Sequence, residues 1–358
     1  MENLQANTLI TVIITHYNYS RFIEAALRSV LVQTHATFEC VVVDDCSDAT
    51  ERERLNEIVA GLSDRRFRVL ALPENKGQIN AVFEGLKATR GEFVSLLDPD
   101  DRYAPTFLAR LLQSHLNPCV YAATASCEMA LFRIGGDQLT TSYSGFKSKA
   151  IADGSLPRAE ASLVDFGYSK HYPAETTGWL WGTTSSMMFR RDALECLRRD
   201  TYVPDTKVHA DTYCVYGAHM LGGTLFVDEV LSYRGLHRDN SAESPLVIAT
   251  RQNRHRPEFD DISRKIRNFV MHTLMANGNA AKLLPQDLAK VLQAHFSPAE
   301  RKAFYRAFPQ YKEMVRPFMT TGLWERVENY ARGRRLEAAL RRAERLKRLA
   351  AGIPVPRS

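Results

Sequence analysis

The fold is decided by a short stretch, Phe93-Val-Ser-Leu-Leu-Asp-Pro-Asp-Asp101, in which a mostly apolar run ends in a cluster of acidic residues. The length and composition of the run predict a buried β-strand. Three comparable runs precede it along the chain, at residues 9–14, 41–43 and 68–72. The first hundred residues therefore contain four expected strands.

Apolar residues at helical spacing lie between these runs, in the segments 22–31, 55–62 and 79–86. The first of these segments follows Ser20, a residue type that favours the start of a helix. Alternating strands and helices predict an α/β fold with a parallel sheet covered on both faces. Ligands bind at the carboxyl ends of the strands in such sheets, so the polar residues after each run are the first candidates for a site.

Composition sets the class of protein. The chain has 358 residues, 45% of them hydrophobic, and a net charge of +6, which indicates a globular protein with an ordinary core. Its six cysteines form no Cys-x-x-Cys pair, which argues against a zinc site. Residues 1–8 do not resemble a signal peptide, and no apolar run approaches the roughly 18 residues of a membrane span. We therefore expect a soluble cytoplasmic protein.

Three polar clusters follow the expected strands: Thr15-His-Tyr-Asn18, Asp44-Asp-Cys-Ser47 and Asp98-Pro-Asp-Asp101. Two acidic clusters on one sheet edge repel each other unless a positive group lies between them. A divalent cation bound together with phosphate would supply that charge, since Mg²⁺ and Mn²⁺ prefer carboxylate oxygen. The alternative is that these aspartates only form turns and helix caps.

The motifs in order resemble those of the family 2 glycosyltransferases, which have a GT-A fold. The similarity rests on five segments: Val12-Ile-Ile-Thr-His-Tyr-Asn18, Ser29-Val-Leu-Val-Gln33, Val42-Val-Asp-Asp-Cys-Ser47, Asn75-Lys-Gly77 and Arg90–Asp101. It extends over about residues 8–241 and is weaker after the first hundred. Two residue types depart from the family pattern, because Cys46 stands where Gly is common and Val82-Phe83 where Arg and Asn are common.

The resemblance implies a role for each matching residue. A nucleotide-sugar site would be formed by Thr15, Tyr17, Asn18, Asp44, Asp45, Lys76 and Asp98. Within it, Asp45 would bind the base, Asp44 would support the ribose side, and Lys76 could replace a missing donor contact. A divalent metal, Mn²⁺ or Mg²⁺, would be held by Asp100, Asp98 and His237. Asp101 either belongs to this site or caps the following helix.

The second half of the chain carries weaker matches. Gly182-Thr-Thr-Ser-Ser-Met-Met-Phe-Arg-Arg191 resembles the acceptor-side strand, and we expect Trp181 and Gly182 to bind the acceptor, with Trp179 as a second stacking residue. His209-Ala-Asp211 takes the place of the usual acidic pair, which leaves Asp211 as the catalytic base. A Trp at such a position is equally often part of the core.

The implied activity is inverting transfer of a sugar from a nucleoside-diphosphate sugar, a UDP-sugar above all, to a saccharide or lipid-linked acceptor in cell-surface polysaccharide assembly. A nucleotidyltransferase is a weaker alternative, because no glycine-rich phosphate loop follows Ile14. A catalytically silent nucleotide-sugar binder or scaffold is the other alternative, which the altered 209–211 element keeps open.

Three units are expected: a GT-A domain at 1–245, a helical extension at 246–330 and a basic amphipathic tail at 331–358. Residues 121–241 contain few helical patterns, so we expect an irregular region that completes the sheet. Ser297-Pro-Ala-Glu300 predicts a helix start with a capping box. The tail is a candidate for peripheral contact with the anionic inner face of a membrane through residues 332–350. An acidic partner or a packed, solvated helix are alternatives, and nucleic acid is not expected.

Overall fold

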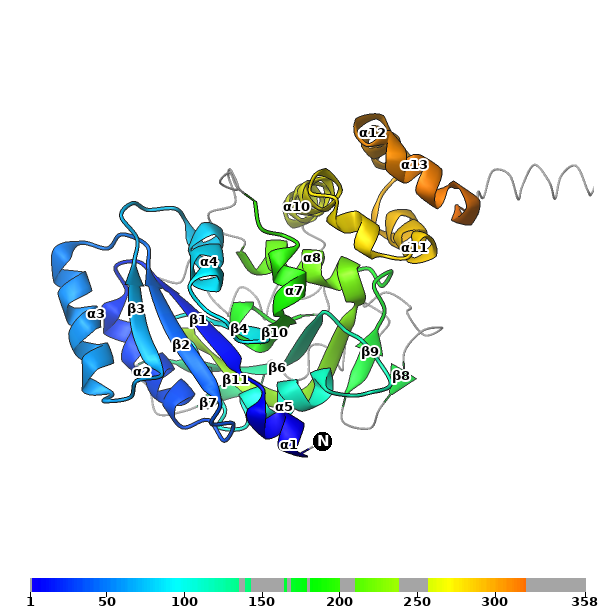
Figure 1. Cartoon of the computed structure of the whole chain (residues 1–358). Coiled ribbons are helices and arrows are strands. Elements are labelled where there is room, and N and C mark those ends of the chain that lie inside the picture. The colour runs from blue at the N-terminus through cyan, green and yellow to red at the C-terminus, as the bar shows by residue number, and fades with distance from the viewer. Residues whose placement is uncertain are drawn as a thin grey trace, which may run out of the picture.

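The structure is a computed structural model, and it describes residues 2–134, 139–142, 164–165, 169–178, 181–199, 210–237 and 257–319 (Figure 1). The basic tail, Trp179, His209 and residues 238–256 lie outside the described residues. Within these ranges, no helix combines the length and the apolar character that crossing a membrane requires.

The first half of the chain forms the parallel part of the sheet. Its strands are β1 (Ile10–His16), β2 (Phe38–Asp44), β3 (Phe67–Ala71) and β4 (Phe93–Leu97). They lie in the order β3-β2-β1-β4, and every neighbouring pair is parallel. The four predicted strands and their parallel pairing are therefore confirmed.

Helices cover both faces of this half. The helices are α1 (Glu2–Asn7), α2 (Ser20–Leu31), α3 (Ala49–Gly61), α4 (Gln78–Lys87) and α5 (Phe107–His115). Apolar residues of α2 and α5 pack with Val12 and Ile14 on one face of β1. Those of α4 pack with Ile13 on the other face. Alternation along β1 therefore divides the core into two layers, as expected for a buried strand.

The second half of the chain extends the sheet with mixed pairing. Short strands are β5 (Arg102–Tyr103), β7 (Leu139–Ser142), β8 (Val164–Asp165), β9 (Lys170–Tyr172) and β10 (Met187–Arg190). The long strands are β6 (Thr124–Arg133) and β11 (Thr224–Leu236), which pair in parallel. Strand β10 lies between β4 and β6 and is antiparallel to both.

The expectation of an irregular middle region is wrong for much of it. Besides β6 and β11, it contains α7 (Arg191–Glu195) and a thirteen-residue helix, α8 (Ala210–Gly222). Ten of the thirteen residues of α8 are buried, so the helix has no polar face. Sequence periodicity detects a helix by the contrast between its faces, and α8 lacks that contrast.

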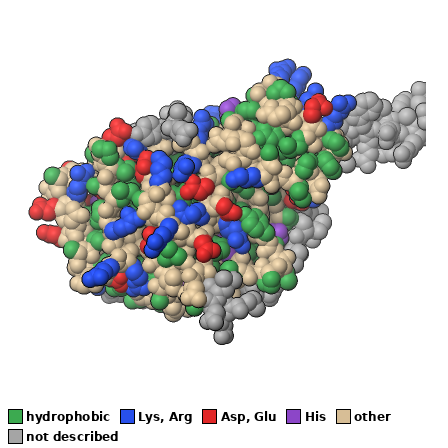
Figure 2. Space-filling model, in the orientation of Figure 1, with side chains coloured by type: hydrophobic (Ala, Val, Ile, Leu, Met, Phe, Trp, Pro, Cys, Tyr) green, Lys and Arg blue, Asp and Glu red, His purple; other side chains and the backbone are tan. Residues whose placement is uncertain are grey.

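The C-terminal part is helical, as expected. It consists of α10 (Pro257–Ala276), α11 (Pro285–His295), α12 (Pro298–Ala307) and α13 (Pro309–Val315). The predicted capping box of Ser297 and Glu300 is confirmed at the start of α12. Helix α10 packs on α8, and its apolar side chains continue the core of the sheet. The pair α12 and α13 stands farthest from the sheet and shows a group of Lys and Arg side chains at its tip (Figures 1 and 2).

Candidate active site

The predicted clusters meet at one edge of the sheet because the strands that carry them are adjacent and in register. Residue Ile14 of β1 pairs with Leu97 of β4, and His16 at the end of β1 pairs with Asp44 at the end of β2. The polar residues that follow these strands therefore face a common region, as expected for a parallel sheet.

Asp44 has no exposed surface, and protein groups neutralise its charge. Its carboxylate lies 3.1 Å from His16 Nδ1 and accepts a hydrogen bond of 2.9 Å from Arg52 Nε. Burial alone would raise the pKa of Asp44, but hydrogen bonds from His16, Ser47 and Arg52 outweigh it and lower the pKa to about 2. The prediction that Asp44 supports the ribose side is therefore wrong. This carboxylate is buried, and its hydrogen bonds fix the turn after β2.

Asp45 holds the loop that leads into α4. Its two carboxylate oxygens accept hydrogen bonds from the backbone N–H groups of Lys76, at 2.7 Å, and Gly77, at 2.8 Å. Gly77 has a φ of 79°, a value that glycine adopts without strain. The Nζ of Lys76 lies 3.2 Å from Glu84, so its positive charge is shared with a carboxylate of α4. Both predicted donor-binding residues thus lie at the sheet edge.

The loops after β1 and β2 are joined by Asn18. Its N–H donates to Ser47 Oγ at 2.9 Å, and its side-chain oxygen accepts from the N–H of Asp48 at 3.0 Å. Asn18 and Cys46 have φ values of 52° and 66°. Cys46 therefore adopts the left-handed conformation that a glycine there would take easily, so the turn is kept at some conformational cost. Tyr17 is half exposed beside it.

Asp98 follows β4 and lies against the start of α4. Its carboxylate accepts a 3.0 Å hydrogen bond from Gln78 Nε2, and its N–H donates to Ser185 Oγ at 3.0 Å. The same Gln78 amide is 3.5 Å from Thr15 Oγ1. Burial, followed by the charges of Asp100 and Asp211, raises the pKa of Asp98 to about 7. The carboxyl group of Asp98 is therefore near enough to those of Asp100 and Asp211 to respond to their charges.

Asp101 does not cap the next helix. Helix α5 begins after Thr106, whereas the buried carboxylate of Asp101 accepts a 2.9 Å hydrogen bond from the N–H of Gly235. A side chain at position 235 would place its Cβ 2.0 Å from the carbonyl oxygen of Asp100. Burial and the charges of Asp100 and Asp98 raise the pKa of Asp101. Glycine at position 235 is thus required for β11 to approach the acidic cluster.

His237 comes from the end of β11 and contacts the same cluster. Its Nε2 is 2.9 Å from Asp100 Oδ2 and 3.1 Å from the hydroxyl of Tyr19. The imidazole stacks on Phe22, with ring centroids 4.2 Å apart. The structure thus brings His237 to Asp100, as the sequence predicted, but through a direct hydrogen bond.

Asp211 is the second residue of α8 and lies at its N-terminal end. Its Oδ1 accepts hydrogen bonds from the N–H of Thr212, at 2.6 Å, and from its hydroxyl, at 3.2 Å. The positive end of the helix dipole favours a charged carboxylate at this position. The charge of Asp211 raises the pKa of Asp98, so α8 brings a third carboxylate near the residues that follow β4.

A divalent cation fits this arrangement. In the part of the chain that the structure describes, no three His, Cys, Asp or Glu side chains converge as a ready metal cluster, so Asp98, Asp100 and His237 do not form a complete ligand set. Mg²⁺ and Mn²⁺ sites of this kind need only one or two carboxylates, with phosphate oxygens as further ligands. Burial and the charges of Asp100 and Asp211 raise the pKa of Asp98 although the charge of Arg234 opposes them, so a bound cation would stabilise the ionised carboxylates.

The predicted acceptor residues lie elsewhere than expected or have a structural role. The ring of Trp181 is only 2% exposed, and its indole N–H donates to Thr224 Oγ1 at 3.0 Å. This side chain therefore belongs to the core, and the prediction that it stacks on a sugar is wrong. Gly182 is buried, and a Cβ there would meet Ser186 Oγ at 2.5 Å, so glycine is required by close packing.

Several residues of the site were missed by sequence reasoning. They are Arg52 and His16 beside Asp44, Gln78 beside Asp98, and Tyr19 and Phe22 beside His237. Their spacing along the chain carries no signal, except that Gln78 follows the Asn75-Lys-Gly77 motif directly. The two arginines at the end of the 182–191 segment have a structural role: Arg190 of β10 donates to Ala122 O, and Arg191 of α7 donates to Leu86 O.

The family model that matches the chain is that of glycosyl transferase family 2, and it covers residues 11–198. The match includes more than half of the chain and both acidic clusters. The protein belongs to this family, and with the strand order described above its fold is of the GT-A type.

Curated relatives match over different lengths. An uncharacterized glycosyltransferase of Nostoc sp. is 26% identical over 68% of this chain and 69% of its own length. The succinoglycan biosynthesis protein ExoO of Rhizobium meliloti is 39% identical over 29% of each chain. WfgD of Escherichia coli, a UDP-Glc:alpha-D-GlcNAc-diphosphoundecaprenol beta-1,3-glucosyltransferase, is 37% identical over 26% of this chain and 35% of its own. The last two matches therefore span about a third of those proteins.

Among solved structures, Staphylococcus aureus TarS residues 1–349 in complex with UDP-GlcNAc is similar with a TM-score of 0.48 and 21% identity. That match covers 86% of this chain and 80% of the other.

Proposed function

We propose that the protein transfers a sugar from a nucleoside-diphosphate sugar to an acceptor hydroxyl with inversion at the anomeric carbon. One observation carries the proposal: the residues that follow β4 and β11 meet at the ligand edge of the sheet, where Asp100 Oδ2 lies 2.9 Å from His237 Nε2. Family membership supplies the reaction class, and the resemblance supplies the stereochemistry.

Each group of residues has its own role in the proposed reaction. Asp98 and Asp100 would hold Mn²⁺ or Mg²⁺, which when bound neutralises charge on the departing nucleoside diphosphate. Thr15, Tyr17, Asn18 and Asp45 line the donor side, where Gln78 orients Asp98. Asp211 accepts the proton of the acceptor hydroxyl as that oxygen attacks the anomeric carbon.

The relatives suggest the substrates and the setting. The names of ExoO and WfgD refer to succinoglycan biosynthesis and to a UDP-Glc-dependent transferase that acts on a diphosphoundecaprenol-linked sugar. We infer that this chain uses a UDP-sugar, acts on a saccharide or lipid-linked acceptor, and serves bacterial polysaccharide synthesis at the cytoplasmic face of a membrane. The unit boundaries at residues 245 and 330 belong to the same proposal, as does contact of residues 332–350 with the membrane.

Thermal melting tests the donor and the metal. The protein is melted with a panel of nucleoside diphosphates and nucleotide sugars, with and without Mn²⁺. A ligand that binds only the folded state raises the midpoint by mass action, so we expect a metal-dependent rise with uridine nucleotides. Asp100→Ala should abolish it, and Asp228→Asn, a half-exposed carboxylate on β11, should leave it unchanged. No rise with any nucleotide at saturation would contradict the proposal.

Sugar transfer tests the catalytic role against that of a silent binder. Asp211→Asn should lower kcat by about 10²–10⁴, the usual contribution of a general base, while the nucleotide-dependent rise in melting temperature persists. A wild-type protein that binds the nucleotide and transfers no sugar to any polyprenyl-diphosphate or oligosaccharide acceptor would support the scaffold alternative.

A further inference from the structure

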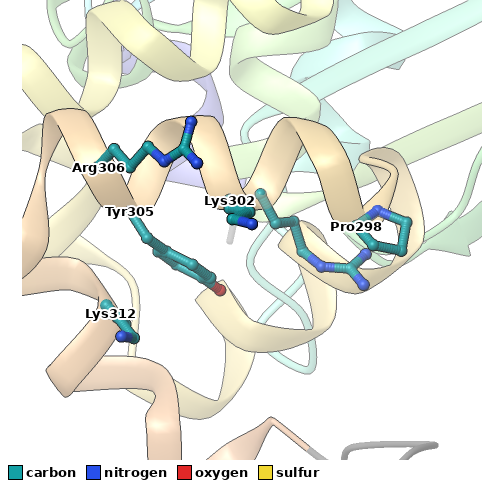
Figure 3. A pocket seen from close by; sticks show the side chains of 6 residues that line it. Pro298, Lys302, Tyr305, Arg306 and Lys312 are labelled. Atoms are coloured by element: carbon teal, nitrogen blue, oxygen red, sulfur yellow. The ribbon is translucent and has the colours of Figure 1, made fainter.

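A pocket of about 370 Å³ lies in the helical part of the chain (Figure 3). It is lined by Pro298, Arg301, Lys302, Tyr305 and Arg306 of α12 and by Lys312 of α13. Four of the six lining residues are cations. The acidic cluster of the proposed active site contributes none of them, so the pocket is a separate feature of the opposite charge.

The sequence fixes the shape of this pocket. Helix α12 begins at a capping box, and Pro309 starts α13 directly after Phe308, so the two helices meet at a sharp corner. Phe304 and Tyr311 are buried and anchor the two helices to the core, and Tyr311 also donates a 3.2 Å hydrogen bond to Met275 O. The cations of α12 and α13 are therefore presented by a packed scaffold.

The carboxylates of this unit pair with other cations. Residues 285–319 contain six Lys or Arg and three Asp or Glu. Asp287 pairs with Lys290 at 3.4 Å, and Glu313 pairs with Arg316 at 3.5 Å. Glu300 caps α12 through Ser297 and lies 3.5 Å from Arg264 of α10.

The four remaining cations are those of the pocket. Among the described residues, no ion pair with a carboxylate forms at Arg301, Lys302, Arg306 or Lys312. Arg301 is fixed in place, because its guanidinium donates to the carbonyls of Phe296 and Leu292 at the end of α11. The side chains of Lys302, Arg306 and Lys312 are exposed and can turn toward a ligand. Like charges held together in this way favour a compact polyanion.

We propose that this pocket binds a phosphate or diphosphate group. Such a group carries two or more negative charges and several acceptor oxygens, which match the ammonium groups of Lys302 and Lys312 and the planar donors of Arg306. The hydroxyl of Tyr305 supplies a further polar group at the same place. The volume lies within the range of small-molecule sites. The group can come from a soluble phosphate compound or from a phospholipid headgroup.

The test uses the full chain in EDTA, which removes metal-dependent binding at the acidic edge. Calorimetric titration with inorganic diphosphate measures the soluble source, and sedimentation with phosphatidylglycerol or phosphatidylcholine vesicles measures the lipid source. The pocket variant is Lys302→Gln with Arg306→Gln. The control variant, Lys290→Gln with Arg316→Gln, removes the same charge from cations of the same unit that are paired with carboxylates.

The wild-type protein should bind diphosphate or phosphatidylglycerol vesicles, and the pocket variant should bind at least tenfold more weakly, while the control loses less than threefold. Binding of diphosphate alone identifies a soluble ligand, and binding of the vesicles as well identifies a headgroup. Binding of neither probe, or equal loss in both variants, overturns the proposal. Circular dichroism checks that both variants are folded. The Mn²⁺-dependent nucleotide shift should persist in the pocket variant, so the two proposals can fail separately.

Discussion

The two acidic clusters at the sheet edge are built from the same residue type, and the protein treats their charges in opposite ways. Asp44 is enclosed by His16, Ser47 and Arg52, and its pKa is lowered to about 2. Asp98 is near other carboxylates, and burial together with their charges raises its pKa to about 7. The clusters follow β2 and β4 of one parallel sheet, which lie on either side of β1.

The two clusters therefore differ in role: the first stabilises the fold, and the second is suited to bind a ligand. The charge of Asp44 is balanced within the protein, so it contributes to folding and needs no ligand. The charges of Asp98, Asp100 and Asp101 are not balanced in the same way, and a bound cation would relieve their repulsion. Residue type and strand position alone do not distinguish a structural carboxylate from a ligand-binding one, whereas their neighbours do.

The largest expected effect on stability comes from Asp44→Asn. Removing the carboxylate from this fully buried site costs about 3–5 kcal/mol, because a neutral amide cannot accept the hydrogen bonds of His16, Ser47 and Arg52 together. Asp100→Asn should change the free energy of unfolding by less than about 1 kcal/mol, because it also removes repulsion from Asp98. Urea denaturation measures the free energy of unfolding of both variants. Equal losses would contradict the difference in role between the two clusters.

Gly235→Ala should have the next largest effect. The added Cβ would meet the carbonyl oxygen of Asp100, so the backbone must shift, at a cost of about 1–3 kcal/mol. The metal-dependent rise in melting temperature with nucleotides should also be smaller in this variant, because Asp100 moves. Gly61→Ala is the matched control: no heavy atom lies within 4 Å of its Cβ, and alanine favours the end of α3. A Gly235→Ala protein with wild-type stability would show that the close approach of β11 is dispensable.

Acid should weaken the protein before Asp44 is protonated. Burial lowers the pKa of His115 and His219 to about 3 and of His295 to about 4. Below pH ~6.5 the unfolded chain therefore binds protons at these histidines, and at His171, whose pKa burial also lowers, that the folded protein does not bind, and stability falls. Asp98 and Asp101, with raised pKa values, act in the opposite direction and make this loss smaller.

The metal-free protein should thus become less stable as the pH falls from ~6 to ~4.5. Urea denaturation across this range measures the slope. Asp44 cannot account for the loss, because stability that depends on a lowered carboxyl pKa disappears only below pH ~4. A flat profile down to pH ~4.5 would contradict the assignment of neutral histidines.

The smallest effect is expected for Arg52→Gln. Arg52 is about one third exposed, so water can replace part of its contact with Asp44, and the melting temperature should fall by only a few degrees. Arg28→Gln is the control, since its pair with Glu24 on α2 is exposed on both sides and should contribute almost nothing. If Arg52→Gln destabilises as much as Asp44→Asn, then His16 and Ser47 contribute little to the neutralisation of Asp44.

The parallel half of the fold could be predicted because each of its elements carries a local signal. Buried strands such as 93–97 are short apolar runs, and α2 has one apolar face. The second half carries a weaker signal. Helix α8 is buried on nearly every side, and β10 lies antiparallel between two strands that are distant from it in sequence. Both features depend on contacts that a local pattern does not contain.

The candidate site was predictable in outline for the same reason. Motif order predicted the meeting of Asp98, Asp100 and His237, and the structure joins Asp100 to His237 directly. The predicted ligand contacts of Asp44 and Trp181 were wrong because both side chains are buried. An aspartate or tryptophan next to a motif can point inward as readily as outward. Gln78 was missed because its amide reaches Asp98 across two elements.

The shared core of α8 and α10 bears on how this chain can be divided. The family match ends at residue 198, before the helix that carries Asp211 begins. One side of α8 is covered by α10, whose Val270, Met271 and Leu274 are buried in that core. A fragment cut after residue 245 would expose this apolar surface and would be prone to aggregate. The C-terminal helices therefore complete the core that supports α8, and a fragment that contains Asp211 needs α10 to stay folded.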